Sequence, residues 1–204
     1  LFEKIFRVAK EERTAWTQEE LEAVVRGHIQ KYAEENMGGV EALSGRERYR
    51  LERMVRSACK LIVHVEAELA QSRFEPSGLE VKLGGDMPAL KIQDPNGLMV
   101  TVGGTIDRVD VYHRPDGKDF VRVIDYKTGG KSFRLGDVLY GLNMQMLIYL
   151  AALAQDGRLH PAGILYMPAA EPSVAAQRGD SPEEVKKAAD RQLRMSGLVL
   201  NDGE

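Results

Sequence analysis

The ten residues from Val121 to Gly130, VRVIDYKTGG, constrain the fold more than any other stretch of the chain. An apolar run typical of a buried strand ends in Asp125 and Lys127, and a Thr-Gly-Gly sequence follows. Alternate residues of a strand face the same side, so this carboxylate and this ammonium share a face. Removing such charges from water is costly unless a partner compensates them. The stretch therefore predicts a sheet that delivers charged groups to a site at the end of one strand.

The residues before this strand predict the other arm of a β-hairpin. We expect the hairpin to span residues 98–127 and to turn at RPDGK, where proline and the following glycine favour a type I turn with a left-handed glycine. A three-residue loop centred on Asp116 places Asp107 opposite Asp125. Two carboxylates and a lysine then gather at one end of a face that otherwise carries valines.

These two aspartates are candidate metal ligands. Like charges directly opposite each other destabilise a sheet, and a divalent cation would compensate them. Hard oxygen ligands suit Mg²⁺, and Mn²⁺ can replace it. Lys127 faces the same side about 7 Å along the strand from Asp125, where it can reach a phosphate or a metal-bound water. Asp110 faces the other side, opposite Arg122, and we expect a structural cross-strand ion pair there.

The chain divides into two regions of different character. Residues 1–73 have helical periodicity, with capping boxes at TQEE and SGRE, and are predicted to form a helical segment packed on the rest. Residues 74–204 mix strands and helices, with a helix predicted at residues 137–154, a strand at 163–167 and a further capping box at Ser181. Because the sequence opens directly in a helical pattern, we expect it to be a piece of a longer protein.

The predicted helix after Ser44 carries a run of basic residues. These are Arg46, Arg48, Arg50, Arg53, Arg56 and Lys60. A solvated helix face explains such a run, because charged faces are common. A face that follows a phosphate backbone also explains it. The sequence leaves both interpretations open.

Composition excludes several classes of protein. Of the 204 residues, 43% are hydrophobic and 29% charged, which is ordinary for a globular protein. The single cysteine, Cys59, excludes an internal disulfide and a zinc or iron–sulfur site held by cysteines of this chain alone. A net charge of −3 disfavours a free-standing DNA-binding domain. No apolar run approaches the ~18 residues of a membrane span, so we expect no membrane partner. With one cysteine and no signal-peptide pattern at the start, we expect a reducing, cytoplasmic location.

Three motifs in order, GTIDRVD, VIDYKTGG and GLNMQMLIYL, resemble the PD-(D/E)XK nucleases of the RecB type. Within them, the chain is most similar to the C-terminal nuclease domains of the AddB family, subunits of bacterial AddAB ATP-dependent helicase–nucleases. The resemblance implies an α/β (α+β) fold with a restriction-endonuclease-like core. In that core a central mixed sheet with an antiparallel hairpin is flanked by helices and preceded by a helical segment.

The resemblance also implies roles for particular residues. Asp107 and Asp125 match the family's metal-binding aspartates, the backbone carbonyl of Tyr126 matches a further ligand, and Lys127 matches the catalytic lysine. Glu80, in LEVKLG, matches an acidic residue that approaches the metal. Taken alone, such a residue is more often a carboxylate on the surface of a strand.

Gln145 and Tyr149 match the family's Q-x-x-x-Y motif. Their four-residue spacing places them on one helix face, where they can present a polar edge together. A core aromatic with a satisfied hydroxyl is the alternative interpretation of Tyr149.

The function implied by the resemblance is a Mg²⁺-dependent deoxyribonuclease that processes double-strand DNA ends for recombinational repair, with DNA and an AddA-like helicase–nuclease subunit as partners. The family's upstream histidine is absent, and so are the cysteines of the iron–sulfur cluster expected in its full-length members. We therefore expect the 204-residue piece alone to cleave DNA poorly or not at all. Two rivals stay open: a catalytically silent nuclease fold that binds DNA or a partner subunit, and a Cas4-type RecB-like exonuclease.

Overall fold

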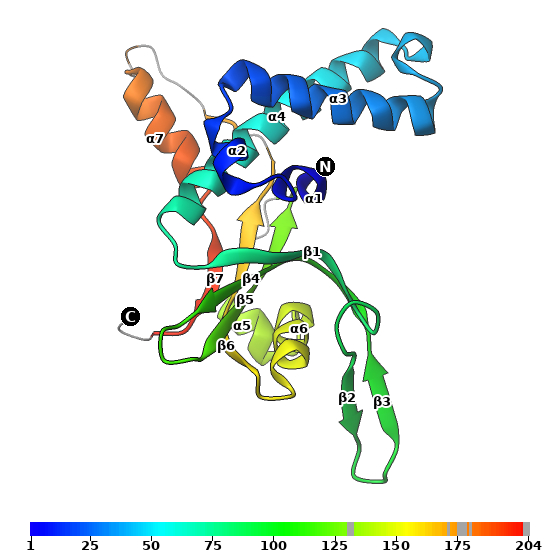
Figure 1. Ribbon diagram of the computed structural model, residues 1–204, viewed down its shortest axis with the longest axis vertical. Helices are drawn as coiled ribbons and strands as arrows, with labels where there is room; N and C mark the ends of the chain where they lie inside the picture. The colour runs from blue at the N-terminus through cyan, green and yellow to red at the C-terminus, as the bar shows by residue number, and fades with distance from the viewer. Residues whose placement is uncertain (130–132, 171, 175–178, 180, 202–204) are drawn as a thin grey trace. The chain divides into compact units, whose positions relative to one another are not determined.

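The computed structural model describes residues 1–129, 133–170, 172–174, 179 and 181–201, and the chain divides into two units, residues 1–71 and 72–204. Unit 1 is helical, and unit 2 contains a five-stranded mixed sheet, a separate two-stranded hairpin and helices (Figure 1). The predicted mixed α/β fold class is confirmed.

The helical unit is organised by two long helices. Its elements are α1 (Phe2–Phe6), α2 (Lys10–Ala15), α3 (Gln18–Met37), the 3-10 helix η1 (Val40–Ala42) and α4 (Gly45–Ala70). Both predicted capping boxes are formed, because Thr17 caps α3 with Glu20 and Ser44 caps α4 with Glu47. The apolar faces of these helices form one core, which contains Ile5, Leu21, Val25, Ile29, Val55 and Ile62.

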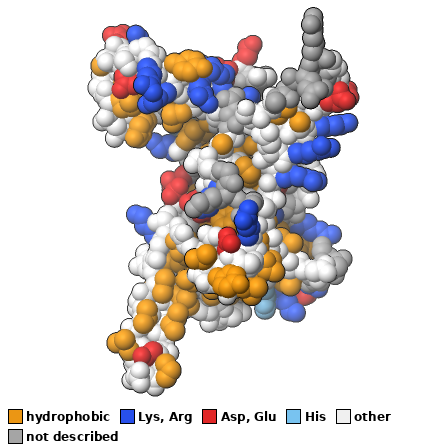
Figure 2. Space-filling model, turned by 180° about the vertical axis from the view of Figure 1, so that it is seen from behind, with side chains coloured by type: hydrophobic (Ala, Val, Ile, Leu, Met, Phe, Trp, Pro, Cys, Tyr) orange, Lys and Arg blue, Asp and Glu red, His pale blue; other side chains and the backbone are white. Residues whose placement is uncertain are grey.

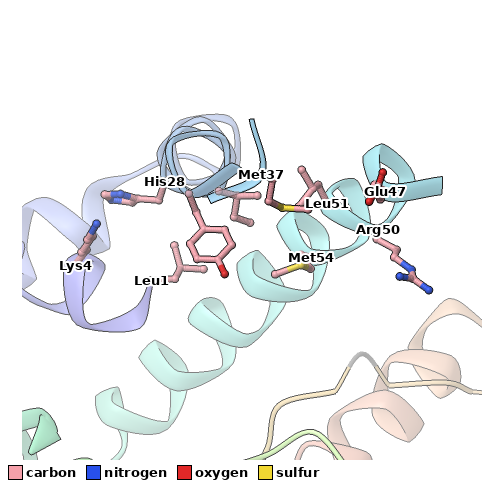
Figure 3. A pocket seen from close by; sticks show the side chains of 10 residues that line it. Leu1, Lys4, His28, Met37, Glu47, Arg50, Leu51 and Met54 are labelled. Carbon is pink, nitrogen blue, oxygen red and sulfur yellow. The ribbon is translucent and has the colours of Figure 1, made fainter. Parts of the chain in front are cut away.

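A groove of about 530 Å³ lies between α1, α3 and α4. Its lining includes the apolar side chains of Met37, Leu51 and Met54, and Arg50 projects from α4 beside Glu47 at its margin (Figure 3). Among the described residues, none of the helices is both long and apolar enough to cross a membrane.

The central sheet has the strand order β1-β4-β5-β6-β7. Its strands are β1 (Glu75–Leu83), β4 (Gly104–His113), β5 (Asp119–Lys127), β6 (Leu159–Pro168) and β7 (Ser196–Val199). Only β5 and β6 run parallel, and the other three neighbouring pairs are antiparallel. This single parallel pair is joined by a helical crossover, as parallel neighbours require.

The register of the β4–β5 hairpin agrees with the prediction. Val109 pairs with Val123, Asp110 with Arg122, and the turn contains Gly117 at φ 85°, a left-handed conformation that glycine adopts without strain. The paired ladder ends at Arg108 and Ile124, so the predicted pairing of Asp107 with Asp125, the next residues along, is not part of it. The strands therefore part at the position where the predicted site begins.

One face of the hairpin packs against helix α6 (Gln145–Ala154), which lies in the crossover between β5 and β6 (Figure 1). The valines of β4 and β5 form the core of unit 2 together with buried residues of α6, namely Met146, Tyr149, Ala152 and Leu153. Because side chains alternate along a strand, Asp125 and Lys127 belong to this same face.

The single helix predicted at residues 137–154 is wrong. The structure has two helices, α5 (Leu135–Leu139) and α6, separated by five residues. Gly141 and Asn143 between them have φ values of 75° and 55°, which no α-helix contains. These left-handed residues break the helix, although the apolar periodicity continues across them.

The predicted start of the hairpin at residue 98 is also wrong. Residues Met99–Val102 form β3, which pairs with β2 (Leu90–Gln93) in a separate hairpin. Hydrophobic side chains lie along this hairpin, and Leu98 and Met99 are exposed (Figure 2).

Near the C-terminus, α7 (Pro182–Gln192) starts at the predicted capping box of Ser181 with Glu184. Strand β7, which pairs with β6, is an element that the sequence pattern does not predict.

Candidate active site

Asp107, Asp125 and Lys127 lie together at the end of the β4–β5 hairpin. The Nζ atom of Lys127 is 2.5 Å from Oδ2 of Asp125. The charges of Asp125 and Lys127 both act on the Asp107 carboxyl group and shift its pKa in opposite directions. The structure therefore brings these three predicted residues close enough to act as one electrostatic unit.

One ammonium group, that of Lys127, compensates two carboxylates in this unit. Burial raises the pKa of Asp107, the hydrogen bond from the Tyr126 N–H lowers it, and the Asp125 charge raises it further. Oδ2 of Asp125 is buried and has no hydrogen-bond partner among the described residues, because Lys127 approaches it outside hydrogen-bonding geometry. The Lys127 ammonium group compensates the charge of Asp125, and a divalent cation would compensate both carboxylates.

Tyr166 is a neighbour of this unit that the sequence motifs do not single out. It lies beside Asp125 across the parallel β5–β6 pair, and Nζ of Lys127 sits 5.2 Å from the centre of its ring. At this distance the ring face attracts the ammonium group. The strand around Tyr166 was predicted, but its register against β5 could not be, because the crossover leaves no local signal for it.

Tyr126 connects the two faces of the sheet. Its backbone N–H donates a hydrogen bond of 2.9 Å to Oδ2 of Asp107, which holds that carboxylate beyond the end of the ladder. Its side chain faces the other side of the sheet, where the hydroxyl group accepts a hydrogen bond of 3.4 Å from Arg108. Tyr126 thus contributes its backbone to the site and its side chain to the opposite face.

That opposite face carries a buried cluster of charges. Asp110 is 0% exposed and accepts hydrogen bonds from Arg108 at 2.6 Å through both of its oxygens. It also accepts one of 2.9 Å from Arg122, which confirms the predicted ion pair. Arg108 was not predicted to take part. Its place two residues before Asp110 on the same strand face is the signal that could have revealed it.

Glu80 is exposed on β1 and has a φ value of 52°. This left-handed conformation is uncommon for a residue other than glycine and carries backbone strain. Among the described residues no three His, Cys, Asp or Glu side chains form a metal-binding group, so the structure does not bring Glu80 together with Asp107 and Asp125. The approach of Glu80 to a metal stays a prediction.

Gln145 and Tyr149 interact as their spacing suggested. Nε2 of Gln145 donates a hydrogen bond of 2.7 Å to the Tyr149 hydroxyl group, and Tyr149 is 6% exposed. The ring of Tyr149 lies directly over Gly104 at the start of β4, where a Cβ atom on residue 104 would overlap the hydroxyl oxygen and the ring carbons next to it. Gly104 is required here because the tyrosine occupies the space of a side chain.

Replacing Gly104 with alanine is therefore expected to lower the free energy of unfolding by about 1–3 kcal/mol, the usual cost of overpacking. Urea denaturation measures this cost. Gly136→Ala is the matched control, because a Cβ at Gly136 meets nothing within 4 Å and this helical glycine should tolerate alanine. Equal stability of the two variants would contradict the close packing of Tyr149 on β4.

The donor set suits a hard divalent cation. The partnerless Oδ2 of Asp125 and the partly buried Asp107 carboxylate supply oxygen atoms of the kind that Mg²⁺ and Mn²⁺ prefer. The carbonyl of Tyr126 is the third oxygen assigned by the sequence motif. Two carboxylates are few ligands, and Mg²⁺ commonly binds through one or two carboxylates while it keeps several waters.

The mixed sheet and the Asp/Asp/Lys arrangement are those of a nuclease, and the family comparison agrees. The model of the PD-(D/E)XK nuclease superfamily matches residues 1–199, so the chain belongs to this superfamily.

Several related proteins are named as subunits of ATP-dependent helicase/deoxyribonucleases. The one from Clostridium novyi (strain NT) is 38% identical over 184 residues, which are 86% of this chain and 16% of the relative. The one from Caldanaerobacter subterraneus subsp. tengcongensis is 36% identical over 192 residues, 91% of this chain and 16% of the relative. The chain thus spans about a sixth of the length of these relatives and is a nuclease domain related to theirs.

Proposed function

We propose that this domain is a Mg²⁺-dependent deoxyribonuclease that hydrolyses phosphodiester bonds at the end of the β4–β5 hairpin. The observation that carries the proposal is that two carboxylates and a lysine gather at one point: Nζ of Lys127 lies 2.5 Å from Oδ2 of Asp125, and the charges of both residues act on Asp107. A binding module has no need of two partly buried carboxylates that repel each other at one point.

The residues of the site have two roles, metal binding and stabilisation of the transition state. Asp107, Asp125 and the carbonyl of Tyr126 would hold the cation, with Asp107 kept in place by the Tyr126 N–H. When bound, the cation supplies Lewis-acid activation of water and offsets charge on the scissile phosphate. Lys127 orients the attacking water and places a fixed positive charge where negative charge develops on the phosphate in the transition state.

The likeness to subunits of a helicase/deoxyribonuclease supports a wider proposal. The full-length protein would act with an AddA-like helicase subunit on double-strand DNA ends, as a step of recombinational repair. DNA unwound by the partner would then reach the nuclease site, where the strand is cut.

The decisive test is Lys127→Ala in the full-length protein. We expect cleavage of linear DNA in Mg²⁺ to fall by about 10²–10³-fold, the usual cost of losing one group that stabilises transition-state charge. Binding of Mn²⁺, measured by calorimetric titration, should persist because both aspartates remain.

Lys118→Ala is the control for this test, since Lys118 is an exposed lysine of the same hairpin near its turn. Cleavage by Lys127→Ala at the rate of this control would remove the lysine from the mechanism and refute the proposal.

A further inference from the structure

The first half of α4 carries a group of arginines that the proposed catalytic site does not use. Arg46, Arg50, Arg53 and Arg56 follow one another at three- and four-residue spacing, so they share one helix face, here called the arginine stripe. All four are exposed. Lys and Arg side chains are prominent over the helical unit in the space-filling view (Figure 2).

The arginine stripe is only partly compensated by nearby carboxylates. None of its four members forms an ion pair among the described residues. Glu47 interacts electrostatically with Arg50 and Glu52 with Arg56, but Glu47 is also engaged in the capping box of Ser44 and Glu52 accepts hydrogen bonds from Arg26. Like charges at these spacings destabilise a helix, so the stripe has a cost that an anionic partner would remove.

An exposed aromatic residue lies within the stripe. Tyr49 is three residues after Arg46 and four before Arg53, and it is 61% exposed. Cationic groups that follow a phosphate backbone, combined with an aromatic ring on which a base stacks, are the two features of proteins that bind single-stranded nucleic acid. A tyrosine can stack in this way only on a base that is not enclosed in a duplex.

We propose that the arginine stripe and Tyr49 bind a single DNA strand, with the arginines on successive phosphates and the tyrosine against a base. This inference rests on the proposed function in that DNA is the substrate, but it assigns a binding surface outside the catalytic site. The stripe from Arg46 to Arg56 is about 15 Å long at 1.5 Å per residue.

The test measures binding of the full chain to a fluorescent oligothymidylate by anisotropy, in chelator so that no cleavage occurs, at several salt concentrations. Each lost phosphate contact on a single strand lowers the salt slope by about 0.7. For Arg50→Gln/Arg53→Gln we thus expect a slope smaller by about 1.4, which corresponds to affinity lower by about 25-fold at 0.1 M salt.

The matched control is Arg48→Gln/Arg158→Gln. It makes the same change in net charge, but Arg48 lies on a different side of α4 and Arg158 lies in unit 2 before β6. The control should keep the wild-type slope. Equal slopes for the two double variants would overturn the proposal, and Arg46→Gln/Arg56→Gln repeats the test at the ends of the stripe should the first variant not fold.

Tyr49→Ala separates stacking from charge. We expect it to weaken binding to the single strand at least about fivefold, equally at all salt concentrations, with little effect on a duplex of the same length. A salt-dependent loss, or equal losses on the two DNAs, would overturn the assignment to a single strand.

Failure of this inference and failure of the proposed function have different signatures. If the protein cleaves DNA in Mg²⁺ but the stripe substitutions leave DNA binding unchanged, only the binding role of the arginine stripe is refuted. Stripe-dependent binding without any Lys127-dependent cleavage by the full-length protein refutes only the nuclease.

Discussion

Replacing Asp110 with asparagine is expected to lower the free energy of unfolding by about 3–5 kcal/mol, the cost of removing one partner from a buried ion pair. Asp110 is 0% exposed and accepts hydrogen bonds from both Arg108 and Arg122. Asparagine has nearly the same shape but carries no charge, so two guanidinium groups would lose the carboxylate between them. Urea denaturation followed by circular dichroism measures the difference.

Asp119→Asn is the matched control for this prediction. Asp119 lies on the same hairpin, and its side chain is 40% exposed and paired with His113. Exposed pairs contribute little, so we expect a change below about 1 kcal/mol. A comparable loss in the two variants would show that the cluster around Asp110 does not stabilise the sheet.

Replacing Asp125 with asparagine is expected to affect metal binding and cleavage rather than stability. Divalent-metal binding and cleavage should be lost, while stability in metal-free buffer changes little, because relief of the repulsion from Asp107 offsets the loss of the ion pair with Lys127. Titration calorimetry with Mn²⁺ and thermal melts in chelator measure the two effects. A large drop in melting temperature would show that Asp125 is a structural residue.

The raised pKa of Asp107 also indicates that a charged carboxylate at this site costs stability in the metal-free protein. It is raised, first by burial and then by the Asp125 charge, against the hydrogen bond from Tyr126. A carboxyl group whose pKa is higher in the folded than in the unfolded protein binds protons more tightly when folded, so ionising it costs stability as the pH rises through the interval between the two values. Asp107→Asn should therefore weaken this pH dependence, and it should also remove metal binding.

The parts of the fold that could be predicted from the sequence are those with local causes. The RPDGK turn fixed the pairing of Val109 with Val123 and of Asp110 with Arg122. Capping boxes fixed the starts of α3, α4 and α7. In each case a few adjacent residues determine the backbone, so a short pattern is sufficient.

The parts that could not be predicted depend on distant residues or on single backbone angles. The left-handed residues Gly141 and Asn143 interrupt a helix whose apolar pattern is continuous. The contact of Tyr166 with Lys127 depends on the register of the parallel strand β6, and that of Tyr149 with Gly104 depends on how α6 packs. Such contacts are set by packing between elements, for which the sequence carries no local signal.

The buried ion pairs of Asp110 also favour one register of the β4–β5 hairpin over its neighbours. Sliding β4 by one residue against β5 would turn Asp110 toward the valine face under α6 and separate it from Arg122. That misalignment would bury an uncompensated carboxylate, so the slipped hairpin is strongly disfavoured. The same slip would move Asp107 away from Asp125. The ion pairs of Asp110 on one face of the sheet thus help to keep Asp107 close to Asp125 on the opposite face.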